Sequence, residues 1–97
     1  MAIINKRSSG ALTGNTLIYT GPCWYYGFVC VTGGSNRTVV LYDEVSATGT
    51  AVENFACDAN KTTDGHSHAI PVYCTTGLYL ALSGGTAVVY YKSAAMG

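Results

Sequence analysis

The sequence predicts an all-β fold, an antiparallel β-sandwich of jelly-roll-like type with an N-terminal arm. About seven short runs rich in β-branched and aromatic residues recur at intervals of roughly 8–12 residues, which is typical of sandwiches and barrels. Alternation supports strands: Leu78, Leu80 and Leu82 would lie on one face, with Tyr79 and Ala81 on the other. No segment combines a 3.6-residue period with capping residues, so no long helix is expected.

Turn signals separate the predicted strands and define their order. The strands are expected at residues 16–20, 23–32, 38–43, 50–57, 68–75, 77–82 and 86–92. Gly21-Pro22 and Ser83-Gly84-Gly85 mark two of the turns. The polar residues 58–65 are predicted to form an exposed loop. Pro71 cannot donate a hydrogen bond to a neighbouring strand, so its run should be an edge strand or contain a bulge.

The chain length of 97 residues fits one domain. Residues 1–15 show no sustained periodicity and are predicted to form an N-terminal arm, with the β-sandwich domain at 16–97. Two isoleucines precede the first charged residues, which is not the order of a secretion signal. No run reaches the roughly 18 apolar residues of a membrane-spanning helix. We therefore expect assembly in a cytoplasm and no membrane partner.

The composition is apolar and almost uncharged. Hydrophobic residues make up 48% of the chain and charged residues 10%, and the net charge is zero with neutral histidines. There is no basic surface to attract phosphates, so nucleic acid is not an expected partner. A neutral, tyrosine-rich surface tends to associate. We therefore predict a homo-oligomer, with a trimer favoured.

The four cysteines, Cys23, Cys30, Cys57 and Cys74, allow two interpretations. An even number would suit two disulfides in a secreted domain. Buried free thiols are favoured instead, because no secretion signal is recognised. No C-x-x-C spacing is present, so neither a redox pair nor a zinc knuckle is indicated.

The strongest candidate for a chemical site is His66-Ser67-His68. Residues i and i+2 of a strand share a face, so both imidazoles could bind one metal ion, and further ligands would be sought among Cys57, Asp58, Asp64 and Cys74. The favoured interpretation is a polar loop entering a strand, with the histidines exposed or bonded to backbone. The sequence thus leaves His66 and His68 as weak metal candidates and predicts no cofactor.

Nothing in the sequence indicates catalysis. Asp43 and Glu44 would point to opposite faces of a strand, and with Glu53 and Asp58 they form no recognisable acid–base pair. Asp43 is instead expected to cap the turn that follows it. Nucleophile elbows and phosphate loops are also missing. We predict no catalytic residues and no enzyme activity.

Aromatic residues concentrate in two of the predicted strands. Alternate aromatics in a strand usually divide between the core and a neighbouring subunit. An aromatic platform that stacks on sugar rings is the alternative. Together with two isoleucines of the arm, they give these interface candidates: Ile3, Ile4, Trp24, Tyr25, Tyr26, Tyr90 and Tyr91.

Several strand-and-turn phrases resemble those of small tailed-phage virion proteins. Residues 42–50 (YDEVSATGT), preceded by Val39-Val40-Leu41, are similar to the "vtlYD-x-x-S-a-x-G-T" phrase of that group. Residues 21–31 resemble its "G-x-c/l-x-y-G-v-x-v" strand. Residues 72–80 followed by 87–91 are similar to its ending. The resemblance covers about residues 16–92.

The resemblance implies a β-sandwich component of a phage particle, located in the virion. A capsid decoration (cement) protein would stabilise the capsid lattice by protein–protein contacts with the major capsid protein or another lattice protein. A small tail component, or a carbohydrate- or receptor-binding β-sandwich module, is the alternative. His66-Ser67-His68 and the four cysteines are not part of the pattern.

Overall fold

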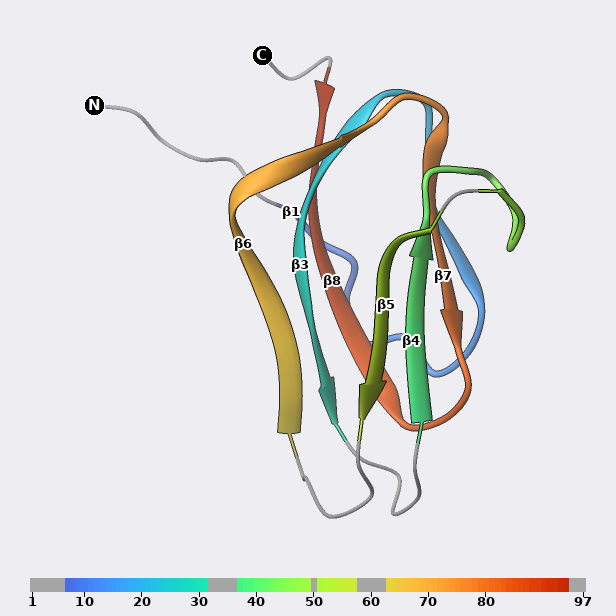
Figure 1. The fold of residues 1–97 in the computed structure, drawn as a ribbon, viewed down its shortest axis with the longest axis vertical. Helices are drawn as coiled ribbons and strands as arrows, with labels where there is room; N and C mark the ends of the chain where they lie inside the picture. Colours follow the sequence, from blue (N-terminus) through green and yellow to red (C-terminus); the bar gives the residue numbers. More distant parts are fainter. Residues whose placement is uncertain (1–6, 32–36, 50, 58–62, 95–97) are drawn as a thin grey trace.

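A computed structural model of the protein describes residues 7–31, 37–49, 51–57 and 63–94 (Figure 1). These residues form two antiparallel four-stranded sheets that pack face to face. Sheet I has the order β1-β8-β3-β6 and sheet II the order β2-β7-β4-β5. The strands are β1 (Arg7–Ser8), β2 (Thr16–Thr20), β3 (Cys23–Val31), β4 (Arg37–Tyr42), β5 (Ala51–Cys57), β6 (Thr63–Cys74), β7 (Gly77–Leu82) and β8 (Thr86–Ser93). The predicted antiparallel β-sandwich is confirmed.

The strand order is that of a jelly roll. Consecutive strands lie in opposite sheets, except β4 and β5, which pair directly in sheet II. This gives two interlocked four-stranded sheets whose neighbours are mostly distant in sequence. Strands β5 and β6 are the edge strands on one side of the sandwich, and each pairs with a single neighbour. Pro71 lies in β6, in agreement with the predicted edge strand.

Two features differ from the predicted strand pattern. Strand β6 already begins at Thr63, so the end of the predicted polar loop is part of the sheet. An eighth strand, β1, lies within the predicted arm and pairs with Tyr90 and Tyr91 of β8. The following residues continue along β8, with the Ser9 amide donating to the Val89 carbonyl at 2.8 Å. Residues 7–12 of the predicted arm therefore run along β8 at the edge of sheet I.

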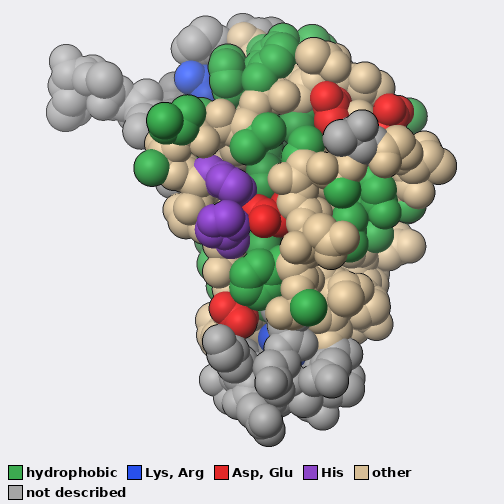
Figure 2. Space-filling model, viewed as in Figure 1, with side chains coloured by type: hydrophobic (Ala, Val, Ile, Leu, Met, Phe, Trp, Pro, Cys, Tyr) green, Lys and Arg blue, Asp and Glu red, His purple; other side chains and the backbone are tan. Residues whose placement is uncertain are grey.

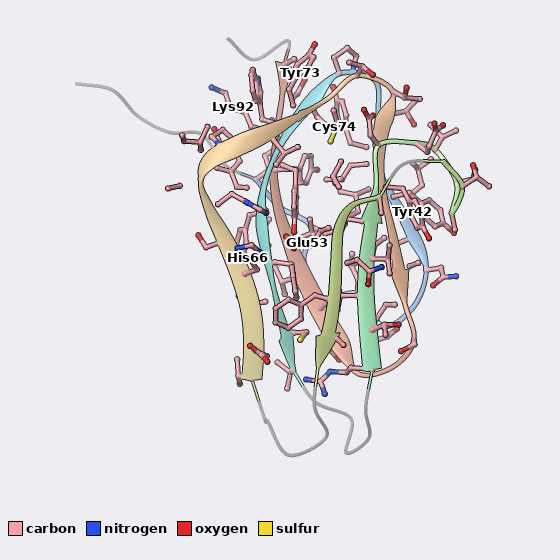
Figure 3. All side chains as sticks on the ribbon, viewed as in Figure 1. Tyr42, Glu53, His66, Tyr73, Cys74 and Lys92 are labelled. Carbon is pink, nitrogen blue, oxygen red and sulfur yellow. The ribbon has the colours of Figure 1, made fainter. Side chains whose placement is uncertain are left out.

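The core lies between the sheets and is built from alternate residues of β3, β4, β7 and β8. Tyr25 and Phe28 are its largest apolar side chains, at 0% and 2% exposure. Cys23, Cys30 and Cys74 are buried free thiols, as predicted, and Figure 3 places Cys74 between the sheets. The side chain of Cys57 lies outside the described part of the chain. Within the described residues, no helix is long and apolar enough to span a membrane.

Asp43 fixes the turn between β6 and β7. Its carboxylate accepts hydrogen bonds from the amides of Thr75 at 3.0 Å, Thr76 at 2.8 Å and Gly77 at 3.3 Å. The expectation that Asp43 caps the turn directly after it is therefore wrong, because the capped turn belongs to a distant segment. Burial raises the pKa of Asp43, but these hydrogen bonds outweigh burial and hold the pKa below its ordinary value.

Replacing Asp43 with alanine should destabilise the protein by about 1 kcal/mol at pH 7, since the carboxylate is partly exposed and solvent weakens its hydrogen bonds. The folded pKa lies below the unfolded value of about 3.9, so the stabilisation is present above that pH and is lost as the pH falls through the folded pKa. Urea unfolding at pH 7 and pH 3 should show the gap between wild type and variant shrinking in acid. The adjacent Glu44→Gln serves as control, and an equal effect of both substitutions would contradict the capping role.

Candidate functional site

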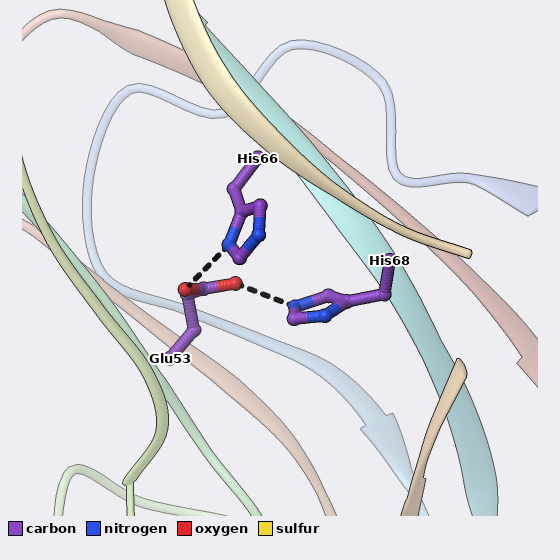
Figure 4. A group of neighbouring side chains, drawn as sticks. All are labelled: Glu53, His66 and His68. Atoms are coloured by element: carbon purple, nitrogen blue, oxygen red, sulfur yellow. Dashed lines mark hydrogen bonds and ion pairs between the residues drawn. The ribbon is translucent and has the colours of Figure 1, made fainter. Parts of the chain in front are cut away.

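A cluster of Glu53, His66 and His68 lies on the side of the sandwich where the edge strands β5 and β6 face each other (Figures 2 and 4). Glu53 comes from β5 of sheet II, and both histidines come from β6 of sheet I. The chain contains two histidines in total, and both meet the same carboxylate. Among the described residues, this is the one group of three such side chains close enough to share a metal ion.

The carboxylate of Glu53 is the centre of this cluster. Its Oε2 atom is 3.1 Å from Nδ1 of His66, and its Oε1 atom is 2.8 Å from Nε2 of His68. The Tyr25 hydroxyl also donates to Oε1 at 3.1 Å. The imidazole rings lie 4.4 Å apart between centroids, and the Tyr25 ring meets His68 edge-on at 5.3 Å. Three donors from sheet I thus converge on one acceptor from sheet II.

An irregularity in β6 begins at His68, which shares the inner face with His66 by strand alternation. Gly27 of β3 pairs with Ser67, whereas Tyr25 pairs with Val72, so residues 68–71 of β6 lie opposite a single residue of β3. Such bulges bend a strand and redirect its side chains. The kink is visible in β6 in Figure 1. It also leaves Ile70 with 84% of its surface exposed, the highest value among the large apolar side chains described.

Two glycines allow the backbones of β3 and β6 to approach closely beside the cluster. Gly27 has φ of 142°, and a Cβ atom there would overlap the carbonyl oxygen of His66. A Cβ atom on Gly65 would overlap the carbonyl oxygen of Phe28. Any other residue at Gly27 would meet both a steric conflict and an unfavourable φ. The position of the His66 backbone therefore depends on a glycine in the adjacent strand.

The site is partly open to solvent and favours an ionised carboxylate. The exposed side-chain fractions are 10% for Glu53, 48% for His66 and 20% for His68. Burial raises the pKa of Glu53, but the hydrogen bonds from His66, His68 and Tyr25 outweigh it and lower the pKa overall. Burial, together with the Glu53 charge, raises the pKa of Tyr25 above its ordinary value. A carboxylate with two imidazoles can serve as a hydrogen-bonded link or as a metal-ligand set.

The sequence identified the two histidines but not their partner. Asp64 and Cys74, which were considered as further ligands, are not part of the group, and the Cys57 side chain and Asp58 lie outside the described residues. Glu53 and Phe55 are two residues apart in β5, so their side chains lie on the same face of the strand, and Phe55 packs against the core. This spacing places Glu53 on the inner face of β5, but the spacing does not show which residues of the other sheet Glu53 contacts.

The predicted interface aromatics divide between the inside and the outside of the sandwich. Tyr25 is completely buried, so it belongs to the core and cannot contact a partner, which corrects its assignment as an interface residue. Tyr91 turns toward the core and packs on Tyr19 with ring centroids 5.9 Å apart. Trp24 packs on the exposed Tyr73 of β6 at 4.7 Å. Ile3 and Ile4 lie outside the described residues.

Tyr26 and Tyr90 contribute to a cleft on the outer side of sheet I. The cleft has a volume of about 460 Å³. Its lining also includes Ser8 of β1 and Ser67 of β6, which supply hydroxyl groups. Ser67 and Tyr90 both pair with Gly27 and so share one face of sheet I, which is the face opposite the buried Tyr25 ring.

Comparisons with protein-family models, curated proteins and solved structures find no match to this chain. Any function must therefore be argued from the geometry of the molecule itself.

Substituting Gly27 with alanine should destabilise the fold by more than about 2 kcal/mol, since the Cβ atom requires both an unfavourable φ and displacement of β6. Gly14→Ala is the matched control, because no heavy atom lies within 4 Å of the position its Cβ would occupy. Chemical denaturation of both variants measures the difference. A Gly27→Ala protein as stable as Gly14→Ala would show that the close approach of β3 and β6 is not required.

Proposed function

We propose that this protein is a non-catalytic structural component of a phage virion, namely a capsid decoration protein. Its partner is the major capsid protein or another protein of the virion lattice. It acts as a homo-oligomer, with a trimer favoured, and stabilises the lattice through contact area rather than chemistry. The resemblance of its strand and turn phrases to virion proteins and the low charge of the chain support this proposal.

The outer face of sheet I is the observation that carries the proposal. The central strand β3 places Trp24, Tyr26, Val29 and Val31 on this face, opposite the buried alternation of Cys23, Tyr25, Phe28 and Cys30. Val29 and Val31 are 37% and 48% exposed. Neighbouring strands add Tyr73, Val88 and Tyr90. Contiguous exposed apolar surface of this kind is typical of interaction sites.

Charge cannot be the main source of affinity at such a face. By strand alternation, Lys92 is the one charged side chain that the described parts of β3, β6 and β8 direct to it. Burial of apolar surface contributes about 25 cal/mol per Å², so an interface of ordinary size can be stable without ion pairs. Few charges would be screened, so the association should resist added salt.

Antibodies against the chain provide the direct test of the proposed location. Immunogold electron microscopy of virions produced with this protein should show label distributed over the capsid. Label confined to the tail would contradict the decoration role and would identify the protein as a small tail component. Virions without label would contradict the proposal.

Substituting Val29 with glutamate should dissociate the homo-oligomer, because it introduces a charge at the centre of the apolar face. Leu17→Glu is the control, since Leu17 is similarly exposed, at 44%, but belongs to β2 of sheet II. Sedimentation velocity should give an oligomer for wild type and Leu17→Glu but a monomer for Val29→Glu, with unchanged circular dichroism. A wild-type monomer at high concentration, or equal behaviour of both variants, would rule out this interface.

Carbohydrate or receptor binding is the second candidate, and the Tyr26–Tyr90 cleft favours it. Its volume falls within the usual range for small-ligand sites, and tyrosine rings with nearby hydroxyl groups suit sugar rings. Tyr26→Ala and Tyr90→Ala should each abolish glycan-array binding, whereas Tyr73→Ala, outside the cleft, should retain it. If the wild-type protein binds no glycan on the array, the proposal that this cleft is a carbohydrate site is wrong.

A further inference from the structure

We propose that Glu53, His66 and His68 form a binding site for a divalent transition-metal ion such as Zn²⁺, which bridges the edge strands β5 and β6. The site is independent of the proposed virion function and lies on a different surface from the outer face of sheet I. A metal ion here differs from the sequence-based expectation of no cofactor, because the sequence does not show that Glu53 lies beside the two histidines.

The three side chains already lie close enough together to share one metal ion. One ligand atom from each of Glu53, His66 and His68 lies within 4.8 Å of the other two. Tetrahedral ligands bound at Zn–N distances of 2.0–2.1 Å stand about 3.3–3.4 Å apart. The two observed nitrogen–oxygen separations, 3.1 Å to Oε2 and 2.8 Å to Oε1, are hydrogen-bond lengths somewhat shorter than this spacing and involve the two different oxygens of the carboxylate. Small rotations of the two imidazoles would be enough to admit an ion.

The chemistry of the donors selects the class of metal. Two imidazole nitrogens with one carboxylate suit Zn²⁺, Co²⁺, Ni²⁺ or Cu²⁺, whereas Ca²⁺ and Mg²⁺ prefer oxygen ligands alone. The three ligands come from two strands and leave further coordination positions toward solvent, because His66 is 48% exposed. Water can complete the coordination shell there, and the exposed side gives the ion a path of entry.

A second layer of contacts holds the ligands in place. The Tyr25 hydroxyl donates to Oε1 of Glu53 from a completely buried position, which fixes the carboxylate orientation. Partners of this kind tune the affinity of metal sites. Strand alternation places both histidines on the inner face of β6, and the close approach at Gly27 fixes the His66 backbone. The ligands are therefore held by the strand framework.

The proposed ion would stabilise the open side of the sandwich. Strands β5 and β6 pair with β4 and β3 respectively, and not with each other. A metal bound to Glu53 on one side and to both histidines on the other links the two sheets directly. Binding to the folded state alone raises stability by mass action. We therefore expect the melting temperature to rise by about 10 °C or more with Zn²⁺ at 100 times its dissociation constant.

Titration of the full-length, chelator-treated protein with Co²⁺ and Zn²⁺ tests the site. Absorption spectroscopy should show one Co²⁺ bound per chain, displaced by Zn²⁺, and differential scanning fluorimetry should show the Zn²⁺-dependent rise in melting temperature. Mg²⁺ should produce neither effect. A wild-type protein without saturable Zn²⁺ or Co²⁺ binding below about 1 mM would overturn the proposal and leave a hydrogen-bonded polar cluster.

Single substitutions at the proposed ligands and at control residues test which side chains bind the metal ion. His66→Gln should weaken Zn²⁺ binding by about 100-fold or more while lowering the metal-free melting temperature only slightly, because His66 is half exposed and glutamine retains an N–H donor for Glu53. Glu53→Gln should abolish the Co²⁺ spectrum. Glu44→Gln, which removes a carboxylate elsewhere, and Cys57→Ala, which tests a thiolate ligand, should bind as wild type. Wild-type affinity in His66→Gln, or lost binding in Cys57→Ala, would assign the metal to other residues.

Discussion

Strand β3 pairs with β8 on one edge and with β6 on the other, and both pairings shift register between Tyr25 and Gly27. This shared irregularity is the constraint on which the rest of sheet I depends. Gly27 lets β6 approach without a steric conflict, and the extra residues 68–71 are accommodated on the β6 side. The same point orients Tyr25 into the core and Tyr26 toward the outer cleft. The register of sheet I, the packing of the core and the geometry of both candidate sites therefore all depend on residues 25–27 of β3.

Glu53 is an uncommon residue for the inner side of a β-sandwich. Moving a carboxylate out of water is costly unless its oxygens are hydrogen-bonded. Here Tyr25, His66 and His68 supply three donors, and all of them come from the opposite sheet. Apolar packing alone could have closed this side of the sandwich. The polar cluster instead makes the contact between the sheets dependent on a few directional interactions, and this arrangement suits a ligand site.

The two candidate surfaces can operate independently. The apolar outer face of sheet I extends across β3 and its neighbours, whereas the Glu53 cluster lies at the lateral opening between β5 and β6. A partner covering the outer face would leave the histidines accessible from the side. A jelly roll occurs in proteins of many functions, so the fold by itself does not decide between these roles. Substitutions of exposed side chains on one surface should leave the other intact, whereas a substitution at Gly27 should disturb both.

Local sequence patterns determined seven of the eight strands, the three described buried thiols and the edge position of Pro71, because alternation and turn residues act over a few positions. The same patterns placed His66 and His68 on one face of a strand. Tertiary structure alone decided what that face meets, since Glu53 and the histidines lie in different sheets. It likewise decided that Asp43 caps the turn at residues 75–77. The physical reason is that a period of two residues specifies which face a side chain occupies, whereas its partner depends on sheet order and register over long sequence separations.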